Sequence, residues 1–144
     1  MSKLRIGAIG CGYWGPNLIR NFIEIPDAEL VAISDLQHDQ LEHMMTRYPQ
    51  ISVATQNFRD FYDLNLDGVI IATPPHTHHA IAMECLDHGL HAQIEKPITL
   101  KSEDAAELTK RAEERGLVLM VGHTFEYNPA VRMLKQIFYD GELG

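Results

Sequence analysis

The feature that most constrains the fold of this chain is the regular alternation of short apolar runs with longer stretches at helical spacing. Runs rich in Val, Ile and Leu predict strands at 4–9, 30–33, 51–53, 69–72, 90–94 and 117–121. Helices are predicted between and after them, around 18–23, 41–48, 58–62, 77–88, 102–115 and 128–138. Since apolar strands that alternate with helices form parallel sheets covered on both faces, we predict a doubly wound α/β fold in a single domain.

Several of these helix boundaries are marked by residues that favour a cap or a stop. Ser102 and Asn128 are predicted N-caps, because their side chains accept hydrogen bonds from the free amides of a first helical turn. Gly89 and Gly116 are predicted to end helices, because glycine adopts the left-handed conformation of a helix C-terminus without steric cost.

Composition and charge exclude several classes of protein. The chain has 144 residues, of which 45% are hydrophobic, and this suffices for one core without help from disulfides or metals. With 12 basic and 20 acidic residues and no basic cluster, it is not expected to bind nucleic acid or an anionic membrane. Its apolar runs are far shorter than the ~20 residues of a membrane helix. Only two cysteines and no signal-peptide pattern predict a cytoplasmic setting.

The loop after the first predicted strand has the pattern G-x-G-x-x-G, formed by Gly10, Gly12 and Gly15. Glycine at such a turn lets backbone amides and a helix N-terminus approach a pyrophosphate, where the aligned peptide dipoles favour negative charge. The position of the loop between a strand and a helix strengthens a motif that is weak by itself. The loop therefore predicts dinucleotide binding.

Asp35, at the end of the second predicted strand, lies 20 residues beyond Gly15. This is the position of an acidic residue that accepts hydrogen bonds from a ribose diol. The alternative is a surface aspartate that caps the next helix. Because a carboxylate repels a 2′-phosphate, and no Arg or Lys occurs in the ten residues after Asp35, NAD is favoured over NADP.

A second candidate segment, TPPHTHH at 73–79, follows the fourth strand at the carboxyl edge of the sheet. Three explanations for its three histidines stay open. They are a metal site, a solvated helix start and the rim of an active site. The edge position favours the rim, whereas helical spacing does not bring all three histidines together and no acidic or cysteine ligand is near in sequence. We predict no metal.

A third candidate segment, Glu95-Lys96-Pro97, follows the fifth strand at the same edge. A lysine in a polar loop is most often solvated or loosely paired, here with Glu95 or Glu103. Beside a nicotinamide ring, however, a lysine is placed to hydrogen-bond the hydroxyl of a substrate and to exchange a proton with it.

Together these segments resemble the N-terminal half of the glucose–fructose oxidoreductase / inositol dehydrogenase (Gfo/Idh/MocA) family. The resemblance rests on GCGYWGPN at 10–17, ATPPHTH at 72–78, GLH at 89–91 and EKP at 95–97. VGHTF at 121–125 and YNPA at 127–130 extend it over nearly the whole chain. It implies the Rossmann fold and an NAD-dependent dehydrogenase that acts on a secondary alcohol of a sugar or sugar-nucleotide, with a homo-oligomer as a further expectation.

The resemblance also implies roles for ten residues. The group around the pyrophosphate consists of Gly10, Gly12, Tyr13 and Trp14, and Asp35 holds the adenosine ribose. The group around the nicotinamide half consists of Thr73, Pro74, His78, Glu95 and Lys96, with Lys96 as the catalytic lysine. Residues 1–144 are then the dinucleotide-binding domain, and the second α/β domain that supplies the substrate pocket in the family is absent from this chain. We therefore expect the chain alone to be inactive.

Two departures from the family pattern affect the substrate side, namely Glu126 in place of a frequent arginine and Gln93 within a usually apolar strand. A rival function is a nucleotide-binding or redox-sensing module without catalysis, which would need the glycine loop and Asp35 but not Lys96. A second rival is a histidine-based metal protein.

Overall fold

The structure is a computed structural model that describes residues 2–142. This part of the chain contains one six-stranded parallel sheet with the strand order β3-β2-β1-β4-β5-β6. The strands are β1 Leu4–Ile9, β2 Ala28–Ser34, β3 Val53–Thr55, β4 Gly68–Ile71, β5 His91–Ile94 and β6 Leu119–Val121. The helices are α1 Gly15–Glu24, α2 His38–Arg47, α3 Pro75–Asp87, α4 Ser102–Arg115 and α5 Pro129–Tyr139, with 3₁₀ turns η1 Phe58–Asp63 and η2 Thr124–Tyr127.

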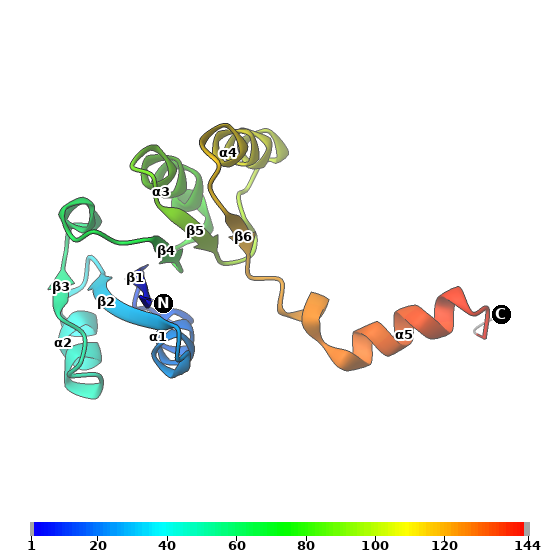
Figure 1. Ribbon diagram of the computed structural model, residues 1–144, viewed down its shortest axis with the longest axis horizontal. Helices are drawn as coiled ribbons and strands as arrows, with labels where there is room; N and C mark the ends of the chain where they lie inside the picture. The colour runs from blue at the N-terminus through cyan, green and yellow to red at the C-terminus, as the bar shows by residue number, and fades with distance from the viewer. Residues whose placement is uncertain (1, 143–144) are drawn as a thin grey trace.

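The predicted doubly wound fold is confirmed, because helices cover both faces of the sheet. In Figure 1, α1 and α2 lie on one side of the sheet and α3 and α4 on the other. Successive strand residues point to opposite faces, so Ile70 of β4 packs in the core under α1 and α2, whereas Val69 and Ile71 pack under α3 and α4. This alternation explains why the strands read as continuous apolar runs.

The order of the strands places a crevice between β1 and β4. The chain winds outward from β1 to β2 and β3, then crosses to β4 on the other side of β1 and continues to β5 and β6. The connections after β1 and β4 therefore leave the sheet in opposite directions. Ligands of such sheets bind at this point, beyond the carboxyl ends of the strands.

Three details differ from the sequence prediction. The third strand is not 51–53 but Val53–Thr55, because Ile51 is instead a buried anchor whose amide donates to the Tyr48 carbonyl in a turn. The helix predicted around 58–62 is the 3₁₀ turn η1. Ser102 is the first residue of α4 rather than its cap, which is Lys101 without a side-chain cap bond. Glu103 and Asp104 complement the first turn by charge instead.

Two predicted helix boundaries are confirmed, and backbone geometry explains both. Gly116 ends α4 at a left-handed φ of 64°. Asn128 caps α5, and its Oδ1 accepts hydrogen bonds from the amides of Ala130 and Val131 at 2.9 and 3.4 Å. Among residues 2–142, no helix has the length and apolar character needed to span a membrane.

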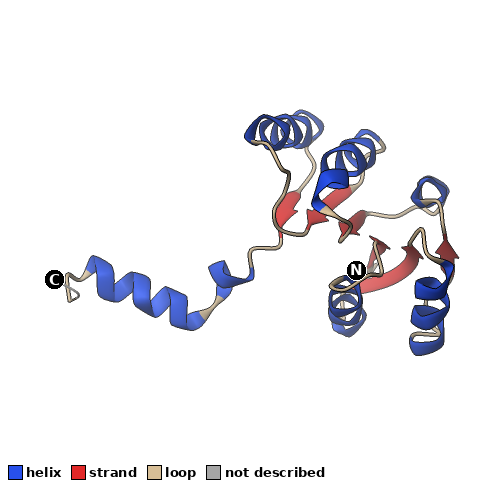
Figure 2. Ribbon diagram, turned by 180° about the vertical axis from the view of Figure 1, so that it is seen from behind, coloured by secondary structure: helices blue, strands red, loops and turns tan. Residues whose placement is uncertain are grey.

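The C-terminal segment extends away from the sheet. Figures 1 and 2 both show η2 and α5 projecting outward beyond β6. Val131, Leu134 and Phe138 lie on one face of α5 at helical spacing, and all three are exposed. The same end of the molecule carries a groove of about 330 Å³ over β4, β5 and β6, on the α1 side of the sheet. Thus two apolar surfaces lie near the β6 end.

Candidate cofactor site

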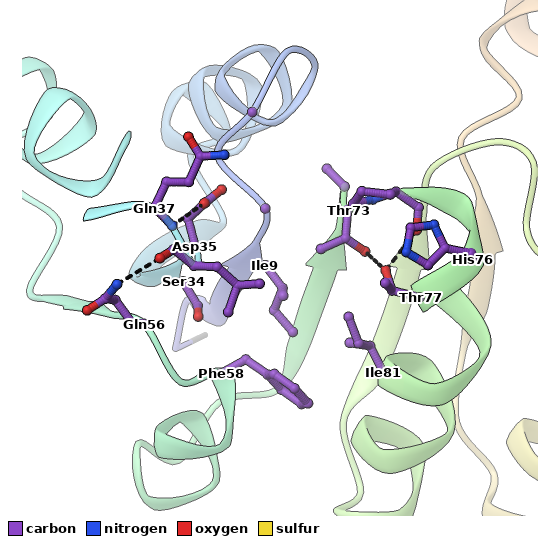
Figure 3. A pocket seen from close by; sticks show the side chains of 15 residues that line it. Ile9, Ser34, Asp35, Gln37, Gln56, Phe58, Thr73, His76, Thr77 and Ile81 are labelled. Carbon is purple, nitrogen blue, oxygen red and sulfur yellow. Dashed lines mark hydrogen bonds between the residues drawn. The ribbon is translucent and has the colours of Figure 1, made fainter. Parts of the chain in front are cut away.

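A cavity of about 460 Å³ lies at the carboxyl ends of β1, β2 and β4. Figure 3 shows it between a wall from the β2 and β3 loops, with Asp35, Gln37 and Gln56, and a wall from the β4 loop and α3. Its lining consists of Ile9, Gly10, Gly12, Ser34, Asp35, Leu36, Gln37, Gln56, Phe58, Ala72, Thr73, Pro74, His76, Thr77 and Ile81. The crevice predicted by the strand order is therefore a real hollow of the size expected for a small-molecule site.

The three glycines of the loop differ in what an added Cβ atom would contact. Gly10 has a φ of 98°, and a Cβ there would lie 2.7 Å from the Ala72 carbonyl group of the neighbouring β4 loop. A Cβ on Gly15 would lie 2.0 Å from the Gly10 carbonyl oxygen, so α1 begins against the loop. A Cβ on Gly12 would meet no atom within 4 Å. Gly12 is the position where a ligand has room to approach the backbone.

Asp35 is fixed by hydrogen bonds to both of its carboxylate oxygens. Oδ2 accepts from the Cys11 amide at 2.7 Å, and Oδ1 accepts from the Gln37 amide at 2.8 Å. The carboxylate therefore joins the glycine loop to the start of α2, and each oxygen keeps a lone pair for a further donor. The alternative role of Asp35, an aspartate that caps the next helix, is supported in part. Its hydrogen bond to Gln37 orders the residue that precedes α2.

The Cys11 thiol beside Asp35 is not a nucleophile. Cys11 is fully buried, and its Sγ lies 4.0 Å from the Ser34 carbonyl oxygen. Burial, and in smaller part the Asp35 charge, raise the pKa of this thiol to about 12. It is therefore protonated at neutral pH and serves packing rather than chemistry.

The far end of the cavity is apolar, and sequence reasoning missed it. Leu36, Phe58 and Ile81 line it together with Gln56, whose Nε2 donates to the Leu36 carbonyl at 2.7 Å. Such walls suit a flat, mostly apolar ring bound next to a ribose at Asp35. The position of Gln56 in the sequence could have identified it as a lining residue, because it directly follows β3 at the same sheet edge.

The loop after β4 is held by the side chains of α3. The Thr77 hydroxyl lies 2.7 Å from the Thr73 hydroxyl and 2.7 Å from the Pro74 carbonyl oxygen. Figure 3 shows Thr73, His76 and Thr77 on one wall of the cavity. Thr73 and Pro74 both line the cavity, and the Thr73 backbone lies next to Gly10 of the glycine loop.

The three histidines of this segment have three different environments. His76 is exposed and lines the cavity, and His79 pairs with Glu107 of α4 at 2.9 Å. His78 is completely buried, with Nε2 2.8 Å from the Thr73 carbonyl oxygen and Nδ1 2.9 Å from that of Pro97. Among residues 2–142, no group of three or more His, Cys, Asp or Glu side chains is arranged to hold a metal ion.

Glu95 and Lys96 lie after β5, outside the lining of the cavity. Lys96 is exposed, whereas Glu95 is buried and its Oε2 accepts from the Lys96 amide at 3.2 Å. A Cβ on Gly122, just after β6, would lie 2.8 Å from Glu95 Oε1. The glycine therefore makes room for the Glu95 carboxylate between the ends of β5 and β6.

Tyr13 and Trp14 are predicted site residues whose side chains project into solvent. Their side chains are 96% and 42% exposed, and neither lines the cavity. The Trp14 carbonyl accepts from the Asn17 amide at 3.0 Å, so this residue forms the start of α1. Of the ten predicted residues, the cavity brings together Gly10, Gly12, Asp35, Thr73 and Pro74.

Comparison with known proteins identifies relatives of the whole arrangement. The model of the GFO_IDH_MocA oxidoreductase family, with an NAD-binding Rossmann fold, matches residues 4–123. The chain is 30% identical to a 4-carboxy-2-hydroxymuconate-6-semialdehyde dehydrogenase of Sphingobium sp., over 97% of this chain and 44% of that protein.

Two solved structures resemble the chain closely. Myo-inositol 2-dehydrogenase from Lactobacillus plantarum superposes with a TM-score of 0.90 at 26% identity, over 99% of this chain and 43% of that one. The WlbA dehydrogenase from Chromobacterium violaceum, in complex with NADH and UDP-GlcNAcA, gives 0.89 at 25% identity, over 97% and 41%. The chain therefore spans less than half the length of these relatives.

Proposed function

Since this chain belongs to the Gfo/Idh/MocA oxidoreductase family and has its NAD-binding Rossmann fold, we propose that it is the cofactor domain of a sugar-type dehydrogenase. The reaction passes a hydride between a secondary alcohol of a sugar or sugar-nucleotide and C4 of the nicotinamide. Relatives that are named for an inositol, or were crystallised with a nucleotide sugar, support this substrate class.

The cavity accounts for the adenosine and pyrophosphate portions of NAD. The open space at Gly12 and the N-terminus of α1 accept the pyrophosphate. The Asp35 carboxylate accepts the ribose hydroxyls, and the apolar end at Leu36 and Ile81 takes the adenine. The described lining contains no Lys or Arg to pair with a 2′-phosphate, which supports NAD over NADP.

The loops after β4 and β5 account for the nicotinamide half in this proposal. Thr73 and Pro74 flank the ring, and Glu95 lies beside its ribose. NAD, when bound, supplies the hydride acceptor. Lys96 has an exposed ammonium group at this edge, and its Nζ hydrogen-bonds the reacting hydroxyl and exchanges a proton with it. Tyr13 and Trp14, which are exposed beside Gly12, lie around the pyrophosphate in this proposal.

We further infer that the substrate pocket is supplied by a second domain of a longer protein. The apolar face of α5 and the groove over β4 to β6 are uncovered within residues 2–142. Surfaces of this kind normally pack against another domain or subunit. The coverage of less than half of each relative agrees with this inference. A homo-oligomer and a cytoplasmic location stay predictions from the sequence.

The observation that carries the proposal is the fixed Asp35 carboxylate at the mouth of a cavity lined by Gly10 and Gly12. The test is calorimetric titration of the chain with NAD⁺ and NADH. We expect saturable binding at one site, weakened by Asp35→Asn but not by Asp39→Asn, a matched exposed aspartate on α2. The absence of saturable binding would remove the proposal.

The rival without catalysis, a nucleotide-binding or redox-sensing module, shares this cofactor site. Titration therefore does not separate the two functions. A loss of turnover in Lys96→Ala separates them, because a sensor has no use for a lysine at the site of hydride transfer.

A further inference from the structure

His78 is a buried polar side chain that connects two loops of the site. Its side chain is completely buried in the first turn of α3. One ring nitrogen lies 2.8 Å from the Thr73 carbonyl oxygen, in the loop after β4. The other lies 2.9 Å from the Pro97 carbonyl oxygen, in the loop after β5. Both distances lie within hydrogen-bonding range.

The chemistry of these partners makes His78 a bridge rather than a ligand-facing group. Carbonyl oxygens only accept hydrogen bonds, so the ring donates to one of them when it is neutral and to both when each nitrogen carries a hydrogen. Both nitrogens are used within the protein. Neither is left to contact a cofactor.

The two tethered loops are the ones that carry the nicotinamide side of the proposed site. Thr73 lines the cavity, and the Thr77 hydroxyl holds it from the α3 side at 2.7 Å, as Figure 3 shows. Pro97 directly follows Lys96, whose own side chain is exposed. On the other flank, the Glu95 amide donates to the Ile71 carbonyl at 2.9 Å. His78 is thus the side-chain link between the peptide next to Lys96 and the cavity wall.

We propose that His78 is a positioning residue that fixes the distance between the Thr73 wall and Lys96, and thereby the width of the nicotinamide subsite. This inference rests on the proposed function, because it takes the nicotinamide to bind between these two loops. It assigns His78 an indirect role, in which the imidazole acts through the backbone of Thr73 and Pro97.

The proposal separates the two halves of the cofactor. ADP-ribose contains everything in NAD except the nicotinamide. In the proposed site it contacts the glycine loop, Asp35 and, through its second ribose, Glu95, whose amide is held by the Ile71 carbonyl and not by the His78 ring. Loosening the tether should therefore weaken NAD⁺ and leave ADP-ribose nearly unaffected. A general loss of packing would weaken both ligands alike.

The experiment compares His78→Gln with the matched control His79→Gln, which removes an imidazole paired on the surface with Glu107. For His78→Gln we expect the Kd for NAD⁺ to rise about 5- to 20-fold and that for ADP-ribose to change by less than about twofold. His79→Gln should alter neither. Hydrogen exchange should become faster in 95–101 of His78→Gln while the amides of β1 and β2 keep their protection.

Two outcomes would overturn the proposal, namely equal weakening of both ligands or no change in either. If the wild-type chain bound neither ligand, the proposed function itself would fail, which is a distinct result. If His78→Gln did not fold, the wild-type chain would give the answer by ¹⁵N spectroscopy of the His78 ring. We expect its nitrogen signals to shift with NAD⁺ but not with ADP-ribose, and identical responses to the two ligands would contradict the proposal.

Discussion

The two ends of the carboxyl edge of the sheet differ in how completely this chain builds them. At β1, β2 and β4, a cavity of about 460 Å³ is closed on two sides, and its acidic residue is fixed by two backbone amides. At β5 and β6, Lys96 is exposed, and the chain continues into η2 and α5 away from the sheet. The first end therefore encloses a cavity, whereas the second exposes polar side chains outside that cavity.

Binding a cofactor and positioning a substrate for hydride transfer place different demands on these two ends. A cofactor that is held through its pyrophosphate and ribose needs backbone amides and one carboxylate, which a single βαβ unit supplies. A hydride transfer needs the alcohol carbon held against the nicotinamide, and this requires walls on the open side. The described residues provide the amides and the carboxylate of the first, and in our proposal they contribute Lys96 and Glu95 to the second.

The largest expected effect concerns turnover by the chain alone. Correct positioning of the reacting groups contributes roughly 7–11 kcal/mol to catalysis, and the enclosure that would provide it is not built by residues 2–142. We expect NAD⁺ to bind without appreciable formation of NADH from a panel of sugars, inositols and nucleotide sugars, followed at 340 nm. Robust turnover would show that the β5–β6 end is complete and would break the comparison.

The next effect concerns Lys96 and is measured in a protein that also contains the substrate domain. Lys96→Ala should lower kcat by about 10²–10⁴-fold, the usual contribution of a positioned acid or base, and leave the Kd for NAD⁺ within a few-fold. Lys96→Arg should rescue little, because a guanidinium does not give up its proton. Lys101→Ala, which removes an exposed lysine at the start of α4, is the control. A near-normal kcat for Lys96→Ala would make Lys96 a solvated loop charge and assign the proton transfer to another group.

A pair of glycine substitutions tests whether the β1 loop is preformed. Gly15→Ala places a Cβ against the Gly10 carbonyl oxygen, so we expect it to destabilise the apo fold by about 3 kcal/mol in urea unfolding. Gly12→Ala meets open space, so stability should change by less than about 0.5 kcal/mol while the Kd for NAD⁺ rises about tenfold. Equal effects of the two changes on stability would mean that the loop is not built as described.

The smallest expected effect is the choice between the two dinucleotides. Repulsion between Asp35 and a 2′-phosphate, together with the missing basic partner, should favour NAD(H) over NADP(H) by roughly 1–3 kcal/mol, about 5- to 150-fold in affinity. Asp35→Asn should reduce that preference in competitive titrations. Stronger binding of NADP(H) by the unmodified chain would assign another role to Asp35.

Sequence reasoning succeeded where local chemistry dictates structure. The doubly wound parallel fold follows from the alternating periods, and the confirmed bounds at Gly116 and Asn128 follow from backbone conformation and capping. Gly10 and Asp35 meet in one cavity because consecutive parallel strands end at the same edge. These features depend on short stretches of chain.

The features that sequence reasoning missed depend on contacts between distant segments. Phe58 and Ile81 face each other across the cavity only because η1 packs beside α3, where Arg59 pairs with Glu84 at 2.6 Å. The contact between the His78 ring and the Pro97 carbonyl joins one βα loop to the next, so no spacing in the sequence predicts it. The role of His78 next to the nicotinamide stays a prediction, now as a proposed positioning role.

The lining of the cavity has a consequence for how such a protein can change over generations. Every residue of that lining lies between Ile9 and Ile81, in the first part of the chain. Substitutions later in the chain leave these side chains intact, so selection can remodel the surfaces beyond β5 without disturbing the adenosine end of the site. The adenosine end of the proposed cofactor site and the surfaces beyond β5 are thereby assigned to separate stretches of the sequence.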